Sequence, residues 1–409
     1  MLKKDTLFEN IVSLFTLKGL EYIIGFITFP YLVHTLGPTY YGVITFTQSF
    51  INYFTLVTDY SFNLTAPQQL ATTEPKYWGK IFTTIMYTKI IILGLCSFFI
   101  VLFITIFDNI FTNKILCFVI YLNVIGNVIF PIWFFQGIQK MRYITIVNIV
   151  SRTIATVLIF IFIKTSNDYI LAALFLSITP IIAGCLSFFV LLTRYKFIFV
   201  KIRLSDIKEQ IKYGWKIFLS IIFINIYSSS NVFFLGLLTN NTIVGYFSAV
   251  KKIIDCINGL LTPITQAIYP YINSKIKTSK KEALLFIKKC TLILSVGTGC
   301  ISIGLYIFSD VLVNIFLGKS FISSIGLLKV MAFLPLITLL SNMWGIQTLI
   351  PFGYKNVFSK IVIKSAILNT LMIFFWIHFL EAEGVAYSML ITELFVTSMC
   401  YYKVKTKIK

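Results

Sequence analysis

Long runs of apolar residues alternate with short polar segments along the whole chain. A helix needs roughly 20 residues to cross the ~30 Å hydrocarbon core of a bilayer, and most of these runs reach that length. The pattern therefore predicts an all-α, polytopic membrane protein. Its twelve expected transmembrane helices lie at residues 8–33, 40–64, 81–107, 115–136, 143–164, 169–193, 214–238, 243–272, 286–308, 326–350, 356–379 and 384–402.

The basic residues test this arrangement, because Lys and Arg gather in the cytoplasmic loops of membrane proteins. Counting from the N-terminus, every second polar segment is rich in Lys and Arg, whereas the intervening segments hold only Lys114, Lys164 and Lys319. We therefore predict that both termini are cytoplasmic. We also expect the apolar run at 8–33 to be retained, because it lacks the small-residue ending of a cleavable signal peptide.

The composition agrees with a membrane protein. Of the 409 residues 58% are hydrophobic, and the mean hydropathy is +0.89, which is too apolar for a soluble domain. The net charge of +20 follows from the basic loops, so we expect no nucleic-acid partner. The seven cysteines lie in apolar runs without a C-x-x-C motif or a nearby His, and we predict neither a metal site nor a cofactor.

The longest basic segment, residues 194–215, follows the sixth span and divides the chain into two halves. We predict an N-terminal six-helix bundle at 1–200 and a C-terminal six-helix bundle at 201–409. A weak internal similarity supports this division: residues 31–42 resemble residues 233–245 with one residue of slippage. Paired halves are common in transporters, although chance similarity between apolar sequences is an open alternative.

Seven basic residues fall inside the predicted spans, where a charge costs roughly 2.5–3.5 kcal/mol and usually faces a bundle interior. They are Lys18, Lys89, Arg152, Lys251, Lys252, Lys329 and Lys364. Lys329 lies near a helix end and can snorkel to the interface, and Lys89, eight residues into its span, can partly do so. We predict that the other five, Lys18, Arg152, Lys251, Lys252 and Lys364, supply the cations that line a central cavity.

Arg152 is the strongest candidate among these cations, because arginine cannot lose its charge and needs a carboxylate, water or phosphate at this depth. A structural pair with Asp59, Asp255 or Glu393 is the alternative for Arg152. The adjacent Lys251 and Lys252 point about 100° apart on a helix, so we expect one to face the cavity and the other to pair with Asp255.

The carboxylates inside the spans are candidates for proton coupling, because burial raises the pKa of a carboxyl group toward the physiological range. They are Glu21, Asp59, Asp255 and Glu393. The alternative is that each is a fixed counter-ion; Glu21, for example, lies three residues after Lys18 on one helix face.

Two cytoplasmic segments, at 194–215 and 273–289, are rich in lysine and are predicted to contain interfacial helices. In the second, Ser279 precedes Glu282 by three residues, which is the spacing of a capping box at a helix start. We expect the lysines of both segments to hold the protein at an anionic inner leaflet. A regulatory or partner-binding role is the alternative.

Three stretches together resemble the Wzx-type polysaccharide flippases of the multidrug/oligosaccharidyl-lipid/polysaccharide (MOP) exporter superfamily. They are Phe29-Pro-Tyr-Leu with Leu36-Gly37, Tyr41-Gly42, Asp59-Tyr60 and Leu64-Thr65-Ala66; Pro131-Ile-Trp-Phe-Phe-Gln-Gly-Ile-Gln-Lys-Met141; and Gly345-Ile-Gln-Thr-Leu-Ile-Pro351-Phe-Gly353. The resemblance implies a MATE-like, alternating-access exporter of undecaprenyl-pyrophosphate-linked oligosaccharide in the bacterial inner membrane, serving O-antigen or capsule biosynthesis. It also implies contact with membrane lipid and with polysaccharide polymerase and chain-length proteins.

Two other functions remain open at this point. A polysaccharide polymerase or ligase would carry a large external loop with catalytic residues, but the longest outward segment, 309–325, has one Asp and one Lys, and His34 and His378 have no obvious acid–base partner. We therefore expect that the protein is not an enzyme. A small-molecule exporter of cations would favour an acidic lumen, which the excess of basic residues in the spans argues against.

Overall fold

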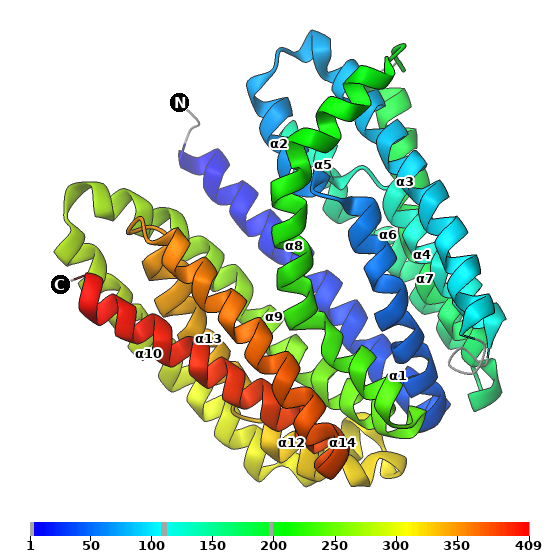
Figure 1. The fold of residues 1–409 in the computed structure, drawn as a ribbon, viewed down its shortest axis with the longest axis vertical. Coiled ribbons are helices and arrows are strands. Elements are labelled where there is room, and N and C mark those ends of the chain that lie inside the picture. The colour runs from blue at the N-terminus through cyan, green and yellow to red at the C-terminus, as the bar shows by residue number, and fades with distance from the viewer. Residues whose placement is uncertain (1–3, 108–112, 196–198, 409) are drawn as a thin grey trace. The chain divides into compact units, whose positions relative to one another are not determined.

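The computed structural model describes residues 4–107, 113–195 and 199–408, with side chains from residue 24 onward except at 220, 223–224 and 226–229 (Figure 1). Regular structure within these ranges is helical, which confirms the all-α prediction. Seven helical segments of the described chain are long and apolar enough to cross a membrane. They are Pro75–Ile106, Lys114–Gly137, Met141–Phe162, Ser166–Arg194, Lys280–Ile307, Lys319–Leu349 and Lys355–Lys407.

Two very long helices each contain one non-helical residue. In α1 (Lys4–Asp59) the break is at Gly37, whose φ of 69° suits a glycine, and Pro38 follows it. In α14 (Lys355–Lys407) the break is at Glu381, with φ 45°. Both breaks fall between predicted spans, at 33–40 and 379–384, so each long helix corresponds to two of the expected crossings.

The chain forms two compact units, which we call unit 1 (residues 1–36 and 46–222) and unit 2 (37–45 and 223–409). Besides most of α1 and the first part of α8 (Leu204–Leu238), unit 1 holds six further α-helices. They are α2 (Phe62–Thr72), α3 (Trp78–Ile106), α4 (Lys114–Ile129), α5 (Ile132–Gly137), α6 (Met141–Phe162) and α7 (Tyr169–Arg194).

Unit 2 contains the rest of α8, all of α14 and the helices between them. These are α9 (Asn241–Thr278), α10 (Lys280–Ile307), α11 (Ser309–Leu312), α12 (Ile325–Met331) and α13 (Leu334–Trp344), with π-helical turns at Val313–Leu317 and Gly345–Leu349. The Ser279 hydroxyl accepts a hydrogen bond from the Glu282 amide at 3.3 Å, which confirms the predicted cap at the start of α10. The predicted boundary at 200/201 lies before α8, whereas the contacts divide α8 after Ile222.

Two details of unit 1 differ from the predicted spans. The second crossing ends at Asp59 rather than at residue 64, because Tyr60 takes a φ of 52° and α2 begins at Phe62. The fourth crossing is divided between α4 and α5, because Pro131 has no backbone N–H to continue the helix. Both breaks lie next to the buried polar residues described below.

An aromatic core surrounds the α2, α3 and α5 end of unit 1. Phe62, Phe82, Trp133, Phe134 and Phe135 are all at most 1% exposed and pack in one cluster. Their rings meet mostly edge-to-face, as in the Phe82 and Phe134 pair with centroids 5.3 Å apart. This aromatic cluster therefore packs the end of unit 1 that also contains the buried polar residues described below.

The two segments of the proposed internal similarity touch each other within unit 2. Thr39 and Thr242 share a hydroxyl hydrogen bond of 2.9 Å. A Cβ added at Gly42 would overlap a carbonyl oxygen at the start of α9, and one added at Gly245 would overlap the carbonyl oxygen of Pro38. Residues at matching positions of the two segments thus make reciprocal contacts, which supports the repeat.

Candidate functional site

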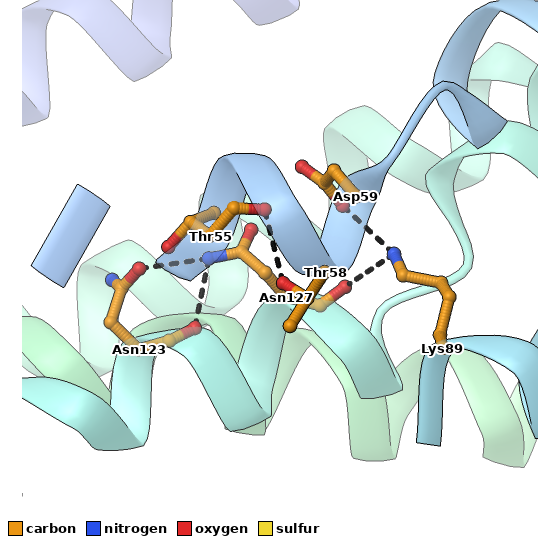
Figure 2. Close-up of polar contacts among 6 residues, drawn as sticks. All are labelled: Thr55, Thr58, Asp59, Lys89, Asn123 and Asn127. Atoms are coloured by element: carbon orange, nitrogen blue, oxygen red, sulfur yellow. Dashed lines mark hydrogen bonds and ion pairs between the residues drawn. The ribbon is translucent and has the colours of Figure 1, made fainter. Parts of the chain in front are cut away.

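A buried ion pair joins α3 to the end of α1 in unit 1. The Lys89 Nζ atom lies 2.8 Å from Asp59 Oδ1 (Figure 2). The Lys89 side chain is 1% exposed and that of Asp59 is 28% exposed. An ammonium group removed from water to this extent requires a closely paired anion, because desolvation of an unpaired charge costs several kcal/mol. The pair therefore keeps a cation inside an apolar helical bundle.

Lys89 has a second acceptor that the sequence explains. Its Nζ atom donates to the backbone carbonyl of Asn127 at 3.3 Å. In a continuous helix this carbonyl would accept from the N–H four residues later, but that residue is Pro131, which has no N–H. The proline therefore frees an oxygen at the C-terminal, partially negative end of α4, where a cation is favourable.

Amide and hydroxyl groups surround the pair. The Asn127 side-chain amide donates to both the carbonyl and the side-chain oxygen of Asn123, each at 2.8 Å, and the Thr58 hydroxyl donates to the Thr55 carbonyl at 3.0 Å (Figure 2). We call Thr55, Thr58, Asp59, Lys89, Asn123 and Asn127 the unit 1 polar cluster. Its ammonium group can bind an anion, and its carboxylate can take a proton or a cation.

Tyr60 fixes the turn that follows Asp59. Its hydroxyl donates to the Ile211 carbonyl at 2.8 Å, and its ring stacks on Phe218 with centroids 4.4 Å apart. A non-glycine residue with positive φ costs of order 1 kcal/mol, so these contacts are needed to hold its φ of 52°. They position Asp59 against Lys89.

The interpretation of Lys89 as a partly snorkelling residue was wrong. That interpretation considered only how far Lys89 lies from the end of its own helix. In the structure, neighbouring helices cover the Lys89 side chain almost completely. Two signals could have found the pair: Asp59 and Lys89 lie at similar distances from the ends of consecutive, antiparallel predicted spans, and Asn127 precedes Pro131 by four residues.

The other predicted cations are distributed over both units. Arg152 is exposed on α6, one turn before Thr156, whose hydroxyl lies 2.9 Å from that of Thr28 on α1. Lys252 on α9 and Lys364 on α14 are also exposed. Their role as cavity cations stays a prediction.

Two of the carboxylates considered as partners of Arg152 pair with lysines instead. Asp59 pairs with Lys89, and Asp255 Oδ2 lies 2.6 Å from Lys251 Nζ one turn earlier on α9. The second pair confirms the expected helical ion pair and identifies Lys251 as the member of the adjacent lysines that takes part in it. The side chains of Lys18 and Glu21 lie outside the described residues.

Unit 2 contains a buried network of neutral polar side chains. Asn369 Nδ2 donates to Asn231 Oδ1 at 3.0 Å, and the Thr392 hydroxyl donates to Asn369 Oδ1 at 3.3 Å. All three residues are at most 2% exposed, and they join α8 to both halves of α14. Asn231 therefore bonds a neighbouring helix through its side chain. Glu393 follows Thr392 directly in α14.

Comparisons with known proteins place this arrangement in context. A family model described as polysaccharide biosynthesis protein matches residues 7–276. A putative O-antigen transporter of Escherichia coli (strain K12) is 32% identical over 398 residues, covering 97% of this chain and 96% of that protein. A putative O-antigen transporter of Shigella dysenteriae is 27% identical over 401 residues, covering 97% and 100%.

Solved structures with a similar fold are also membrane proteins. The lipid II flippase MurJ in an inward closed conformation matches with a TM-score of 0.76 at 12% identity, over 96% of this chain and 87% of that one. An inward-facing multidrug resistance MATE family transporter of the MOP superfamily matches with a TM-score of 0.67 at 15% identity, over 96% and 94%. The chain therefore has the fold of these multi-pass membrane proteins.

Proposed function

Because this chain belongs to the polysaccharide biosynthesis protein family, we propose that it is a flippase that moves lipid-linked oligosaccharide repeat units across the bacterial inner membrane. The substrate we assign is an undecaprenyl-pyrophosphate-linked oligosaccharide of an O-antigen or capsule pathway. The names of the two curated relatives support the O-antigen assignment. A transport role, rather than an enzymatic one, is part of the proposal.

The observation that carries the proposal is the Lys89–Asp59 pair with the freed carbonyl of Asn127. A pyrophosphate group needs cations, and charge-assisted hydrogen bonds to phosphate are strongest where water is scarce. The pair holds the Lys89 side chain inside the bundle while no substrate is bound. Its flexible four-carbon stem allows Lys89 to exchange the carboxylate for a phosphate oxygen.

The same exchange provides a route to coupling. When the pyrophosphate displaces the Asp59 carboxylate from Lys89, that carboxylate loses its counter-ion and is available to bind a proton. Taking up a proton there and releasing it when Lys89 returns would link substrate movement to a proton gradient. Among the candidate carboxylates Glu21, Asp59, Asp255 and Glu393, we therefore place Asp59 first.

The remaining assignments extend this site. Lys18, Arg152, Lys252 and Lys364 contribute further cations to a cavity that opens alternately to each side of the membrane, whereas Lys251 stays paired with Asp255. The lipid tail stays in the bilayer during transfer. Polysaccharide polymerase and chain-length proteins are the protein partners we propose.

Complementation of a flippase-deficient bacterium tests the function. Lipid-linked repeat units on each face of the inner membrane are counted with wild-type protein, with Lys89→Met and with the exposed Lys140→Gln as a matched control. We expect wild type and the control to restore outward units and Lys89→Met to leave them inside. Outward units that accumulate normally without the protein, with only their polymerisation impaired, would instead favour the polymerase or ligase alternative.

A further inference from the structure

The first part of α8, residues 204–222, has two different faces. Ile207, Ile211, Gly214 and Phe218 recur at intervals of four, three and four, so they lie on one side of the helix. Ile207 and Phe218 are each 8% exposed and Gly214 is buried. Because this part of α8 belongs to unit 1, the apolar face is its attachment surface.

Specific contacts fasten that face to the end of α1. The Tyr60 hydroxyl bonds the Ile211 carbonyl and the Tyr60 ring stacks on Phe218. A side chain at position 214 would overlap the Ser61 hydroxyl, so Gly214 permits the close approach. The helix cannot move away from unit 1 without breaking these contacts.

Two polar contacts add to the attachment. The side-chain amides of Gln69 and Gln210 donate to each other, at 3.1 and 3.0 Å. At the start of the helix, Lys80 Nζ lies 2.9 Å from Asp206 Oδ1. Asp206, the carboxylate closest to the helix start, is thereby engaged with unit 1.

The other face of this helix is basic. Lys208, Lys212 and Lys216 recur every four residues and are exposed, and the exposed Lys201 and Arg203 precede them. We call these five residues the basic face of α8. Within the described residues 199–219, the one exposed acid is Glu209, so this segment carries an excess of basic residues.

Exposed aromatic and apolar groups accompany these charges. Tyr213 is 54% exposed, Trp215 is 50% exposed and Leu204 is 75% exposed. Tyr and Trp are typical of the headgroup region of a bilayer, and a helix with basic and aromatic residues binds anionic lipid surfaces.

We propose that the basic face of α8 is a docking site for the headgroups of anionic phospholipids, with Tyr213 and Trp215 seated at the same interface. Charge complementarity selects this occupant: in a multi-pass membrane protein the headgroup phosphates are the anions that a row of lysines meets, and each lysine near an anionic surface strengthens binding. Because α8 is fastened to Tyr60, bound lipid stabilises the turn that positions Asp59.

Thermal unfolding of the full-length protein in an uncharged detergent tests this site. The melting temperature is titrated with dioctanoyl phosphatidylglycerol and with dioctanoyl phosphatidylcholine, since a ligand that binds only the folded state raises it. We expect phosphatidylglycerol to stabilise wild type, phosphatidylcholine to do so far less, and the difference to shrink as NaCl is added. The variant Lys208→Gln/Lys212→Gln should bind phosphatidylglycerol about 30-fold more weakly.

Three further samples make the result decisive. Lys164→Gln/Lys319→Gln removes the same charge elsewhere and should keep wild-type affinity, and Lys208→Arg/Lys212→Arg should keep it even if the glutamine variant folds poorly. Glycerol 3-phosphate carries the anion without the lipid and should not stabilise. The proposal would be overturned if the two lipids stabilised the protein equally, or if glycerol 3-phosphate stabilised it fully. A loss of affinity in the Lys164/Lys319 control or in the arginine variant would also overturn it.

Discussion

Breaking the Lys89–Asp59 pair from its two sides should have unequal effects on stability. Asp59→Asn leaves an ammonium group that is 1% exposed without its anion, whereas Lys89→Met leaves a carboxylate that is 28% exposed and can be partly solvated. Removing one partner of a buried pair costs roughly 3–5 kcal/mol when the remaining charge stays buried. We therefore expect Asp59→Asn near that range and Lys89→Met clearly below it.

The size of the effect follows from the geometry. At a separation of 2.8 Å and an effective dielectric constant of 20, the Coulomb attraction is about 6 kcal/mol, and desolvation of the two ions offsets part of it. The Asn127 carbonyl still accepts from Lys89 in the Asp59→Asn variant, which holds the loss toward the lower end. Spread over the unfolding entropy of a 409-residue chain, a loss of about 3 kcal/mol corresponds to a fall in melting temperature of about 3–4 °C.

Thermal unfolding of the purified single variants and of Asp59→Asn/Lys89→Met measures these effects. In the double variant neither charge of the pair remains, so it should melt above Asp59→Asn alone. Wild type, the two single variants and the double variant form a double-mutant cycle. The difference between the double-variant effect and the sum of the single-variant effects measures the interaction between Lys89 and Asp59. If Asp59→Asn melts like wild type, or if the double variant loses the sum of the two single effects, the pair does not stabilise the fold as argued.

Three further predictions concern the helix break beside this pair and two contacts elsewhere in the chain. Pro131→Ala restores an N–H that competes with Lys89 for the Asn127 carbonyl, so we expect the protein to fold but to export repeat units more slowly in the complementation assay. Gly42→Ala places a methyl group on a carbonyl oxygen of α9 and should lower the melting temperature, whereas Gly94→Ala, which meets no atom within 4 Å, should not. Asp206 accepts from the backbone N–H of residue 203 and pairs with a lysine, which lowers its pKa. Its stabilisation is therefore present at neutral pH and is lost as the pH falls through that lowered pKa, so melting temperatures of wild type and Asp206→Asn should converge in acid.

Much of the fold could be predicted from hydrophobic pattern alone. Apolar runs of the length of a bilayer specify helices, and the break at Gly37 and the pair of Lys251 with Asp255 follow from local rules that need no tertiary information. The membership of 37–45 in unit 2 could not be predicted this way. It depends on contacts between segments about half a chain apart.

In the candidate site, too, some features follow from the local sequence and others depend on tertiary contacts. Asp59 was identified as a buried carboxylate from its position in a span, but its partner was not, because the burial of Lys89 results from neighbouring helices rather than from its own. Arg152 is the strongest candidate by the chemistry of its side chain; the structure shows it exposed on α6, and its role stays a prediction. Depth along one helix does not say which way a side chain faces.

The helix break at Pro131 connects the sequence motif with the chemistry of the site. A proline inside a membrane helix leaves a carbonyl without its donor, and in a bilayer such a group must find another. Here the donor is the ammonium group of Lys89, which also needs the Asp59 carboxylate. The break, the cation and the anion therefore depend on one another: each would be unfavourable alone, and together they hold the cation that we propose for the substrate site.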